Sequence, residues 1–411
     1  MIHASKYQPR CFPVKGDLEP AEIDRAQSID PTESLNREKK YEIGRTLPVG
    51  YIKKSPSIGY RLTQLEYGNI EFWQKLANTE SKGDVGEDAL TLDDFKTPYF
   101  DICAYLTDDD GTFRGTILYP SLRTSGFSIT VGEPQGDIER SFDFVGEGAH
   151  IFKGDNKYYI QNKHTCGSGG DNEIDLSAKA PASLRDGTYM FRVTHYDATD
   201  GSTVELESGV SGYSYSNATK ILTINATIDT NDIIKAYYTS ATAPDVIFTE
   251  NDSDVVGITG ESAEIYLYIP ATGKPDADDD YIYRLQSVTL DVRFEREDLR
   301  EIGNKDVVQR GIREKTVTAT LGRILETFTI EEILNGSDSD HIDVSQLSDE
   351  VALIVKFYSD NSKTTFKYGL KCTEMSPTEL RGGGNANEYI NRENVLEGSD
   401  LSITADESLL V

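Results

Sequence analysis

Apolar and polar positions alternate along much of the chain, which is the pattern of strands with one buried face. The alternation is clearest at residues 285–294, resumes at 317–321, and occurs again on both sides of a glycine-containing turn at 132–136. The apolar positions of these stretches are Leu285, Val288, Leu290, Val292, Phe294, Val317, Ala319, Leu321, Phe127, Ile129, Val131, Ile138, Phe142 and Phe144. We therefore expect a mainly β fold of the α+β class.

Two short segments have apolar residues at helical spacing instead. One covers residues 65–76 and includes Trp73, and the other covers residues 327–334 and includes Ile330. In both segments acidic residues come early, where they interact favourably with the positive end of a helix dipole. These segments predict one short helix each.

The chain contains one passage twice. Arg25, Gln27 and Ser28 are matched by Arg284, Gln286 and Ser287, at a constant offset of 259 residues (284 − 25). The same offset joins Arg37 to Arg296, Glu38 to Glu297, Glu42 to Glu301, Gly44 to Gly303 and Leu62 to Leu321. A match without gaps over such a length indicates a duplication and thus two related domains. A chain that carries one fold twice is suited to a ring or fibre.

The repeat divides the chain into four parts. Residues 1–24 are polar, contain three prolines, and predict an extended N-terminal arm. Residues 25–149 and 256–411 contain the two copies, each expected to be a β-sandwich or barrel with a short helix. Residues 150–255 have no counterpart in either copy and consist of short alternating stretches separated by Gly, Asp, Asn and Ser. This middle unit predicts an inserted, self-contained immunoglobulin-like β-sandwich.

Composition narrows the function further. The chain has 70 acidic and 41 basic residues and a formal net charge of −29, which disfavours tight binding to nucleic acid or to anionic membranes. Its four cysteines are far apart and lack a CxxC spacing, so we expect neither a disulfide framework nor a metal cluster. The N-terminal residues lack the apolar run of a signal peptide, which leads us to expect a protein made in a cytoplasm.

We find no pattern that predicts catalysis or a cofactor. The five histidines have no paired spacing, and Asp276–Asp280 lacks the glycine and final glutamate of an EF-hand loop. Gly382–Gly384 is not followed by the lysine of a phosphate-binding loop. The sequence therefore predicts no catalytic residue, no metal site and no cofactor, and we expect a protein that is not an enzyme.

Both copies contain a long charged connection between two predicted strands, at residues 36–55 and 295–314. Long ordered loops are usually functional or held by a partner. We expect these loops to make contacts between subunits or between rings, through charged residues that include ion pairs. The candidates are Arg37, Glu38, Glu42, Arg296, Glu297, Glu301 and Arg310.

At the duplicated passage the chain resembles the tail tube (major tail) proteins of long-tailed bacteriophages. The resemblance covers both copies but not the middle unit. It lies in Arg284-Leu-Gln-Ser-Val288, Arg296-Glu-Asp-Leu-Arg-Glu-Ile-Gly303, Val317-Thr-Ala-Thr-Leu-Gly322, Gly126-Phe-Ser-Ile-Thr-Val131 and Ser141-Phe-Asp-Phe-Val145. The first copy departs from the pattern at Pro31, where a continuous strand is expected.

The resemblance implies a virion protein of the viral tail with two tandem tube domains, whose sheets join those of neighbouring subunits. Three chains would form a homotrimeric, pseudo-hexameric ring, and the rings would stack into a tube through which DNA is ejected. The implied partners are further copies of the chain, tail terminator, tape measure and baseplate or tip proteins, and passing DNA that is not bound specifically, with no membrane. The middle unit would decorate the outside.

A charge argument applies to the channel of such a tube. Basic groups would retard DNA, whereas carboxylates would leave it hydrated and mobile. We therefore expect a net acidic inner face, with Asp291 as a candidate to line it.

Two other classes remain as alternatives. A carbohydrate-binding tail or surface module would use exposed aromatic residues, for which Tyr213, Tyr215, Tyr237 and Tyr238 are candidates. A non-viral structural protein of the surface-layer type would share the acidic, β-rich composition.

Overall fold

The chain is mainly β, with two α-helices among the described residues, in a computed structural model. This confirms the predicted fold class. The structure describes residues 7–410 apart from 15, 17, 24, 36, 42–46, 48–49, 54–55, 109, 111, 133, 155–156, 168–171, 185–186, 190, 245–256, 271–281, 283–284, 300–308, 326–327, 336–340, 349 and 384–389.

In the first repeat one long strand, β9, pairs with two separate groups of strands. The order β3-β6-β10-β9 forms one sheet, and the other half of β9 pairs with β8 and β11, while β8 pairs with β1. Its elements are β1 (Tyr7–Pro13), β2 (Ala21–Glu22), β3 (Ala26–Ser34), β4 (Arg37–Lys40), β5 (Gly50–Lys53), β6 (Ser57–Leu65), α1 (Glu71–Ala77), β7 (Leu90–Thr91), the 3₁₀ helix η2 (Leu92–Phe95), β8 (Phe100–Thr107), β9 (Phe113–Val131), β10 (Glu139–Gly146) and β11 (His150–Lys153).

The second repeat has the same strand order and the same pairing. The order β20-β21-β24-β23 forms one sheet, and β23 also pairs with β22 and β25, while β22 pairs with β19. Its elements are β19 (Ala263–Tyr268), β20 (Leu285–Leu299), β21 (Gln309–Ile324), α2 (Thr329–Asn335), the 3₁₀ helix η6 (Val344–Gln346), β22 (Val351–Tyr358), β23 (Phe366–Gly383), β24 (Asn391–Gly398) and β25 (Asp400–Thr404).

Even the irregularities of the two repeats coincide. β3 and β6 contain a bulge between Ala26 and Ser28, and β20 and β21 contain one between Leu285 and Ser287, at the offset of 259 residues (285 − 26). Ser121 in β9 and Glu374 in β23 occupy the same left-handed backbone position, with φ of 52° and 55°. Because bulges fix the register of a sheet, residues of one repeat can be assigned to counterparts in the other.

One helix packs against the sheet in each repeat. Phe72 and Trp73 of α1 contact Phe142, and Ile330 and Leu334 of α2 are fully buried in the same core cluster. α1 begins at Glu71 rather than at Leu65, because residues 58–65 are still paired with β10. The helices thus cover one face of each sheet.

Two expectations about the N-terminal region differ from the structure. Residues 7–13 are not a separate arm, because β1 pairs with β8 and buries Cys11 and Phe12. Pro31 does not interrupt its strand, since it lies within β3 opposite Tyr60. β3 is an edge strand of the single chain, where proline is tolerated.

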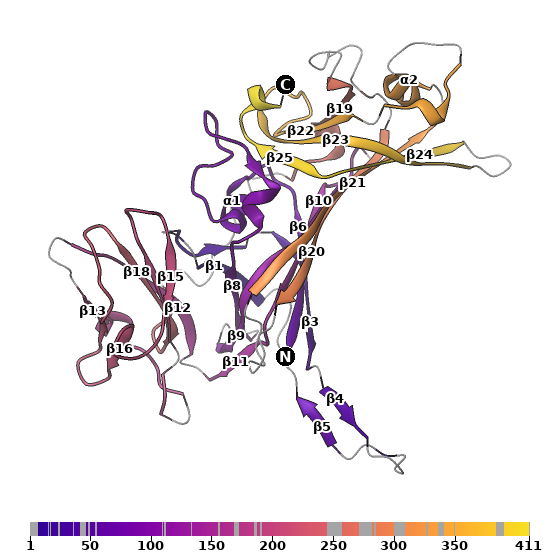
Figure 1. The fold of residues 1–411 in the computed structure, drawn as a ribbon. Helices are drawn as coiled ribbons and strands as arrows, with labels where there is room; N and C mark the ends of the chain where they lie inside the picture. Colours follow the sequence, from indigo (N-terminus) through magenta and orange to yellow (C-terminus); the bar gives the residue numbers. More distant parts are fainter. Residues whose placement is uncertain are drawn as a thin grey trace.

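The middle unit has two sheets. One has the order β12-β18-β14-β15 and the other β13-β17-β16, beside the first repeat in Figure 1. Its strands are β12 (Tyr158–Thr165), β13 (Glu173–Asp175), β14 (Phe191–Tyr196), β15 (Thr203–Leu206), β16 (Tyr213–Ser216), β17 (Ile221–Ile224) and β18 (Ile233–Ser240). β11 lies within the residues expected to form this unit, but it pairs with β9 of the first repeat.

The middle unit also shares a hydrophobic core with the first repeat. Phe12, Cys103 and Leu118 of the repeat belong to one buried cluster with Val193 and Tyr237 of the middle unit. The unit is therefore packed onto the first repeat and is not self-contained as the sequence suggested.

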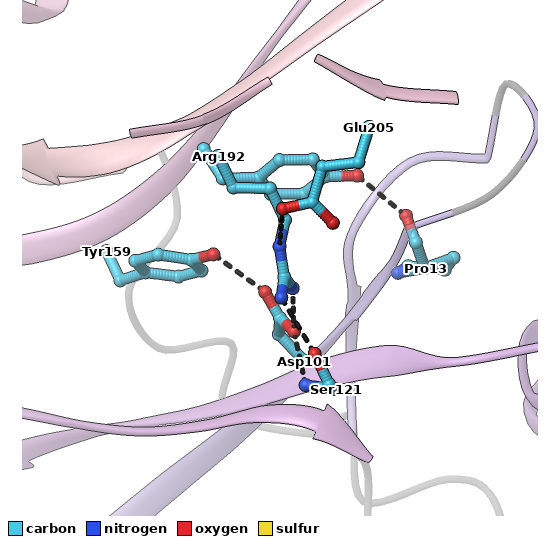
Figure 2. A network of polar contacts seen from close by, with 7 residues as sticks. Pro13, Asp101, Ser121, Tyr159, Arg192 and Glu205 are labelled. Carbon is cyan, nitrogen blue, oxygen red and sulfur yellow. Dashed lines mark hydrogen bonds and ion pairs between the residues drawn. The ribbon is translucent and has the colours of Figure 1, made fainter. Parts of the chain in front are cut away.

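A buried polar network crosses the same boundary (Figure 2). Asp101 of β8 accepts hydrogen bonds from the Tyr159 hydroxyl at 2.7 Å and from Arg192 of β14, and Arg192 also donates to the Ser121 hydroxyl at 2.7 Å. Burial lowers the pKa of Arg192, but the Asp101 carboxylate opposes this, and the pKa lies well above the usual value. The network fixes the orientation of the middle unit.

Candidate assembly interface

The two repeats are joined edge to edge into one continuous sheet. Strand β9 of the first repeat pairs with β20 of the second, from Val288 opposite Val131 to Arg293 opposite Gly126. The result is an eight-stranded run, β23-β24-β21-β20-β9-β10-β6-β3, which crosses the molecule in Figure 1. The joint is therefore made by main-chain pairing between strands that are distant in sequence.

The outer edges of this sheet are the counterparts of the two strands that form the joint. β3 is the counterpart of β20, and the last residues of β23 are the counterpart of residues 126–131 of β9. Neither edge is paired there among the described residues. One complementary pair of edges is thus joined inside the chain. A second such pair, formed by β3 and the last residues of β23, lies at the two outer edges of the sheet.

One face of the sheet is polar, opposite the face that packs on the helices. Most of its charged residues are carboxylates and fewer are arginines, which gives the face an excess of negative charge. They include Asp30, Glu139, Asp143, Asp291, Glu295, Glu314, Glu379, Glu393, Glu397, Arg61, Arg123, Arg293 and Arg381. The positions between them are largely Ser and Thr, such as Ser128, Thr318 and Thr320.

Asp291, the sequence-based candidate for a channel wall, is on this polar face. Its carboxylate accepts a hydrogen bond from the Arg293 guanidinium at 2.8 Å. Asp291 lies in a groove that Arg61 and Asp143 also line. Burial raises the pKa of Asp143, an effect that Arg61 opposes and Asp291 reinforces. The centre of the face is therefore a mixed cluster in which charges of opposite sign alternate.

The charged connections of the two repeats belong to two hairpins with different surroundings. In the first repeat, β4 and β5 form a separate hairpin that projects from the body, and Arg37 and Glu38 are exposed on β4 (Figure 1). Glu42 lies outside the described residues. The sequence did not predict the pairing of β4 with β5.

In the second repeat, β20 and β21 continue without a break into the connection. Arg296 lies against the first repeat of its own chain, where it donates to main-chain oxygens. Glu297 is exposed, and Arg310 lies in β21 opposite Asp298, with its side chain outside the description. Glu301 also lies outside the described residues.

Sequence reasoning missed how Phe294 and Arg296 complete the joint. Phe294 is 3% exposed and packs on Phe127, with ring centroids 6.3 Å apart. Arg296 was selected for its charge, and it donates to the carbonyl groups of Phe95, Lys96 and Thr124. The sequence did contain one signal for this contact, because the apolar Phe294 directly precedes a charged stretch.

Metal, thiol and membrane chemistry give no competing site in the described part of the chain. No group of three or more His, Cys, Asp or Glu residues there could hold a metal ion. All four cysteines are buried, and burial raises the pKa of Cys372 to about 12. Within the same residues, none of the helices has the length and apolar character needed to cross a membrane. The tract 276–280 lies outside the description.

The aromatic candidates for carbohydrate binding are not available as a group. Tyr237 and Tyr238 are fully buried in the middle unit, and Tyr213 and Tyr215 pack partly against Phe191. A stacking surface for sugar rings requires exposed aromatic faces, so this set does not form one.

Comparison of the sequence with models of known protein families and with curated proteins finds no match in either.

Proposed function

We propose that this chain is a structural protein that assembles head to tail into closed rings, which stack into the tail tube of a long-tailed virus. The observation that carries the proposal is the eight-stranded sheet whose two outer edges are counterparts of the strands joined at its centre. Repeating the internal joint between chains continues the sheet from one copy to the next.

The proposed joint has a defined register. Applying the repeat offsets to the pairs between β9 and β20 places Asp30 opposite Gly383, Pro31 opposite Gly382 and Ser34 opposite Glu379 of another copy. Glycine opposite Pro31 leaves room for the proline ring. Such a contact uses a different patch on each partner, and a contact of this kind generates a ring when its rotation closes.

The charge of the polar face supports its assignment as the inner wall. Carboxylates outnumber arginines on this face. Duplex DNA carries about one negative charge per 1.7 Å of axis, so an acidic wall repels it and retains water between the two surfaces. The tube would pass DNA without binding it, and three chains would supply the six repeats of a ring.

A disulfide across the proposed joint tests the function. Asp30 and Gly383 are the counterparts of Thr289 and Thr130, whose hydroxyl oxygens are 3.5 Å apart in the internal joint. Cysteines at both positions should therefore form a disulfide between chains under mild oxidation. We expect covalent species up to a closed trimer on non-reducing gels, and threefold rings in negative-stain images.

The matched control moves one cysteine along the same strand. Asp30→Cys with Glu379→Cys separates the sulfur positions by four residues, or about 13 Å, which a disulfide cannot span. Equal cross-linking of both pairs would contradict the register. A wild-type protein that stays monomeric at high concentration, or rings of six chains, would contradict the proposed function.

A further inference from the structure

The internal joint between the repeats extends beyond the paired strands. After the last residue of β20 paired with β9, Phe294 packs into the core of the first repeat and Arg296 reaches across to it. Arg296 donates to the carbonyl oxygens of Thr124 at 2.5 Å, Phe95 at 2.9 Å and Lys96 at 3.1 Å. One apolar and one cationic side chain therefore complete the joint.

These contacts suit an arginine in particular. Phe95 ends η2 and Lys96 follows it, so their carbonyl groups lie at the end of a helical turn, where acceptors lack partners within the helix. Thr124 lies next to a bulge in the pairing of β9 with β10. The bulge makes the ladder of main-chain hydrogen bonds irregular at this point. A planar guanidinium with several donors can serve all three acceptors at once.

The counterparts of these two residues in the first repeat are exposed. Leu35 corresponds to Phe294 and is 56% exposed, and Arg37 corresponds to Arg296 and is exposed on β4. Leu35 is among the large apolar side chains of the described chain that are exposed. Leu35 and Arg37 thus repeat the pair formed by Phe294 and Arg296. Among the described residues of the single chain, however, they do not contact a surface like the one on which Phe294 and Arg296 pack.

That surface has its own counterpart in the second repeat. Leu380 of β23 corresponds to Phe127, and Pro377 corresponds to Thr124 and adjoins the matching bulge of β23 with β24. η6 corresponds to η2, so residues 346–348 provide the carbonyl groups at the end of the turn. Leu380 is only partly buried in the single chain.

We infer that Leu35 and Arg37 of one copy dock on the second repeat of another copy, with Leu35 on Leu380 and Arg37 on the carbonyl groups of Pro377 and residues 346–348. The inference rests on the proposed function and names the residues that specify its contact. The occupant is a second copy of this chain, because the internal joint already shows the same motif seated on the same kind of surface.

The edge strands explain why these residues matter. Pro31 and Glu33 stand in β3 where Leu290 and Val292 stand in β20. A proline and charged residues weaken an edge against nonspecific pairing. The main-chain joint between chains is therefore weaker than the internal one, and the side-chain contacts beyond it select the correct partner.

The double variant Leu35→Asp with Arg37→Glu tests the inference. A buried carboxylate replaces the apolar contact, and a second one faces the carbonyl groups, so we expect the fraction of protein in rings to fall at least about tenfold. Analytical ultracentrifugation and negative-stain images measure that fraction. Both residues are exposed in the single chain, so its circular dichroism and melting temperature should be unchanged.

A matched variant controls for added charge. Val210→Asp with Lys220→Glu makes the same chemical changes in the middle unit, where Val210 is 97% exposed and Lys220 lies at a turn. It should assemble as the wild type does. Normal assembly of the Leu35 and Arg37 variant, beside a wild type that forms rings, overturns the inference and leaves the proposed function standing. A wild type that forms no rings overturns the function itself.

Discussion

Replacing Glu66 by alanine is expected to lower the free energy of unfolding by about 3–5 kcal/mol, the range for breaking a buried ion pair. Glu66 and Arg140 are both fully buried and approach to 3.2 Å. The carboxylate also accepts hydrogen bonds from the Tyr368 hydroxyl at 2.6 Å and from the backbone N–H of Gly68 at 2.7 Å. Its loss leaves the Arg140 charge buried without a counter-ion.

The position of this network makes the effect global. Glu66 and Arg140 belong to the first repeat, whereas Tyr368 lies in β23 of the second repeat, so the network joins the two halves of the sheet. Burial raises the pKa of Tyr368 well above its usual value, and the Glu66 charge adds to this, so the hydroxyl remains a donor. Both repeats should therefore unfold together in the wild type.

Urea denaturation measures the loss. Tyr368→Phe, which removes one hydrogen bond to the carboxylate, should cost about 1.5–3 kcal/mol. The exposed Glu80→Ala serves as the control and should change stability by less than about 0.5 kcal/mol. A Glu66→Ala protein within about 1 kcal/mol of the wild type would show that Arg140 is stabilised mainly by the aromatic rings around it, among them Phe72 and Phe142.

Replacing Asp101 by alanine should cost a similar amount, about 3–5 kcal/mol, at the boundary with the middle unit. Asp101 is fully buried and accepts from the Tyr159 hydroxyl, the Arg192 guanidinium and the backbone N–H of Ser121. Without it, Arg192 retains the half-exposed Glu205 as an anionic partner, at 3.3 Å. We expect the middle unit to become accessible to proteases before the repeats unfold.

The counterpart of Asp101 in the second repeat is Ala352, so the strand itself accepts alanine at this position. The double variant Asp101→Ala with Arg192→Leu removes both charges and should recover most of the lost stability, because an apolar pair avoids the desolvation of two ions. Urea denaturation of the single and double variants forms the test. A double variant no more stable than Asp101→Ala would mean that the cost comes from the lost Ser121 and Tyr159 hydrogen bonds.

The elements of the fold and their repetition follow from the amino-acid sequence alone. Alternating apolar residues such as Val288, Leu290 and Val292 specify strands because their side chains have a period of two. The constant offset between the copies holds in the structure down to the bulges at Ala26 and Leu285. The repeat could also have revealed strand β1. Its counterpart β19 has a clear alternating pattern in Ala263–Tyr268, whereas Pro9 and Pro13 obscure that pattern in the first copy.

Which edges meet and which charges are buried depends on contacts between segments that are distant in sequence. The joint of β9 with β20 consists of main-chain hydrogen bonds, which carry no signature in the side-chain sequence, between residues more than 150 positions apart, as with Val131 and Val288 (288 − 131). Arg296 is bound by carbonyl groups, and Asp101 by groups from two units, so neither partner could be inferred from local pattern. Periodicity specifies which face of a strand is buried, whereas the choice of neighbour depends on how complete sheets fit together in space.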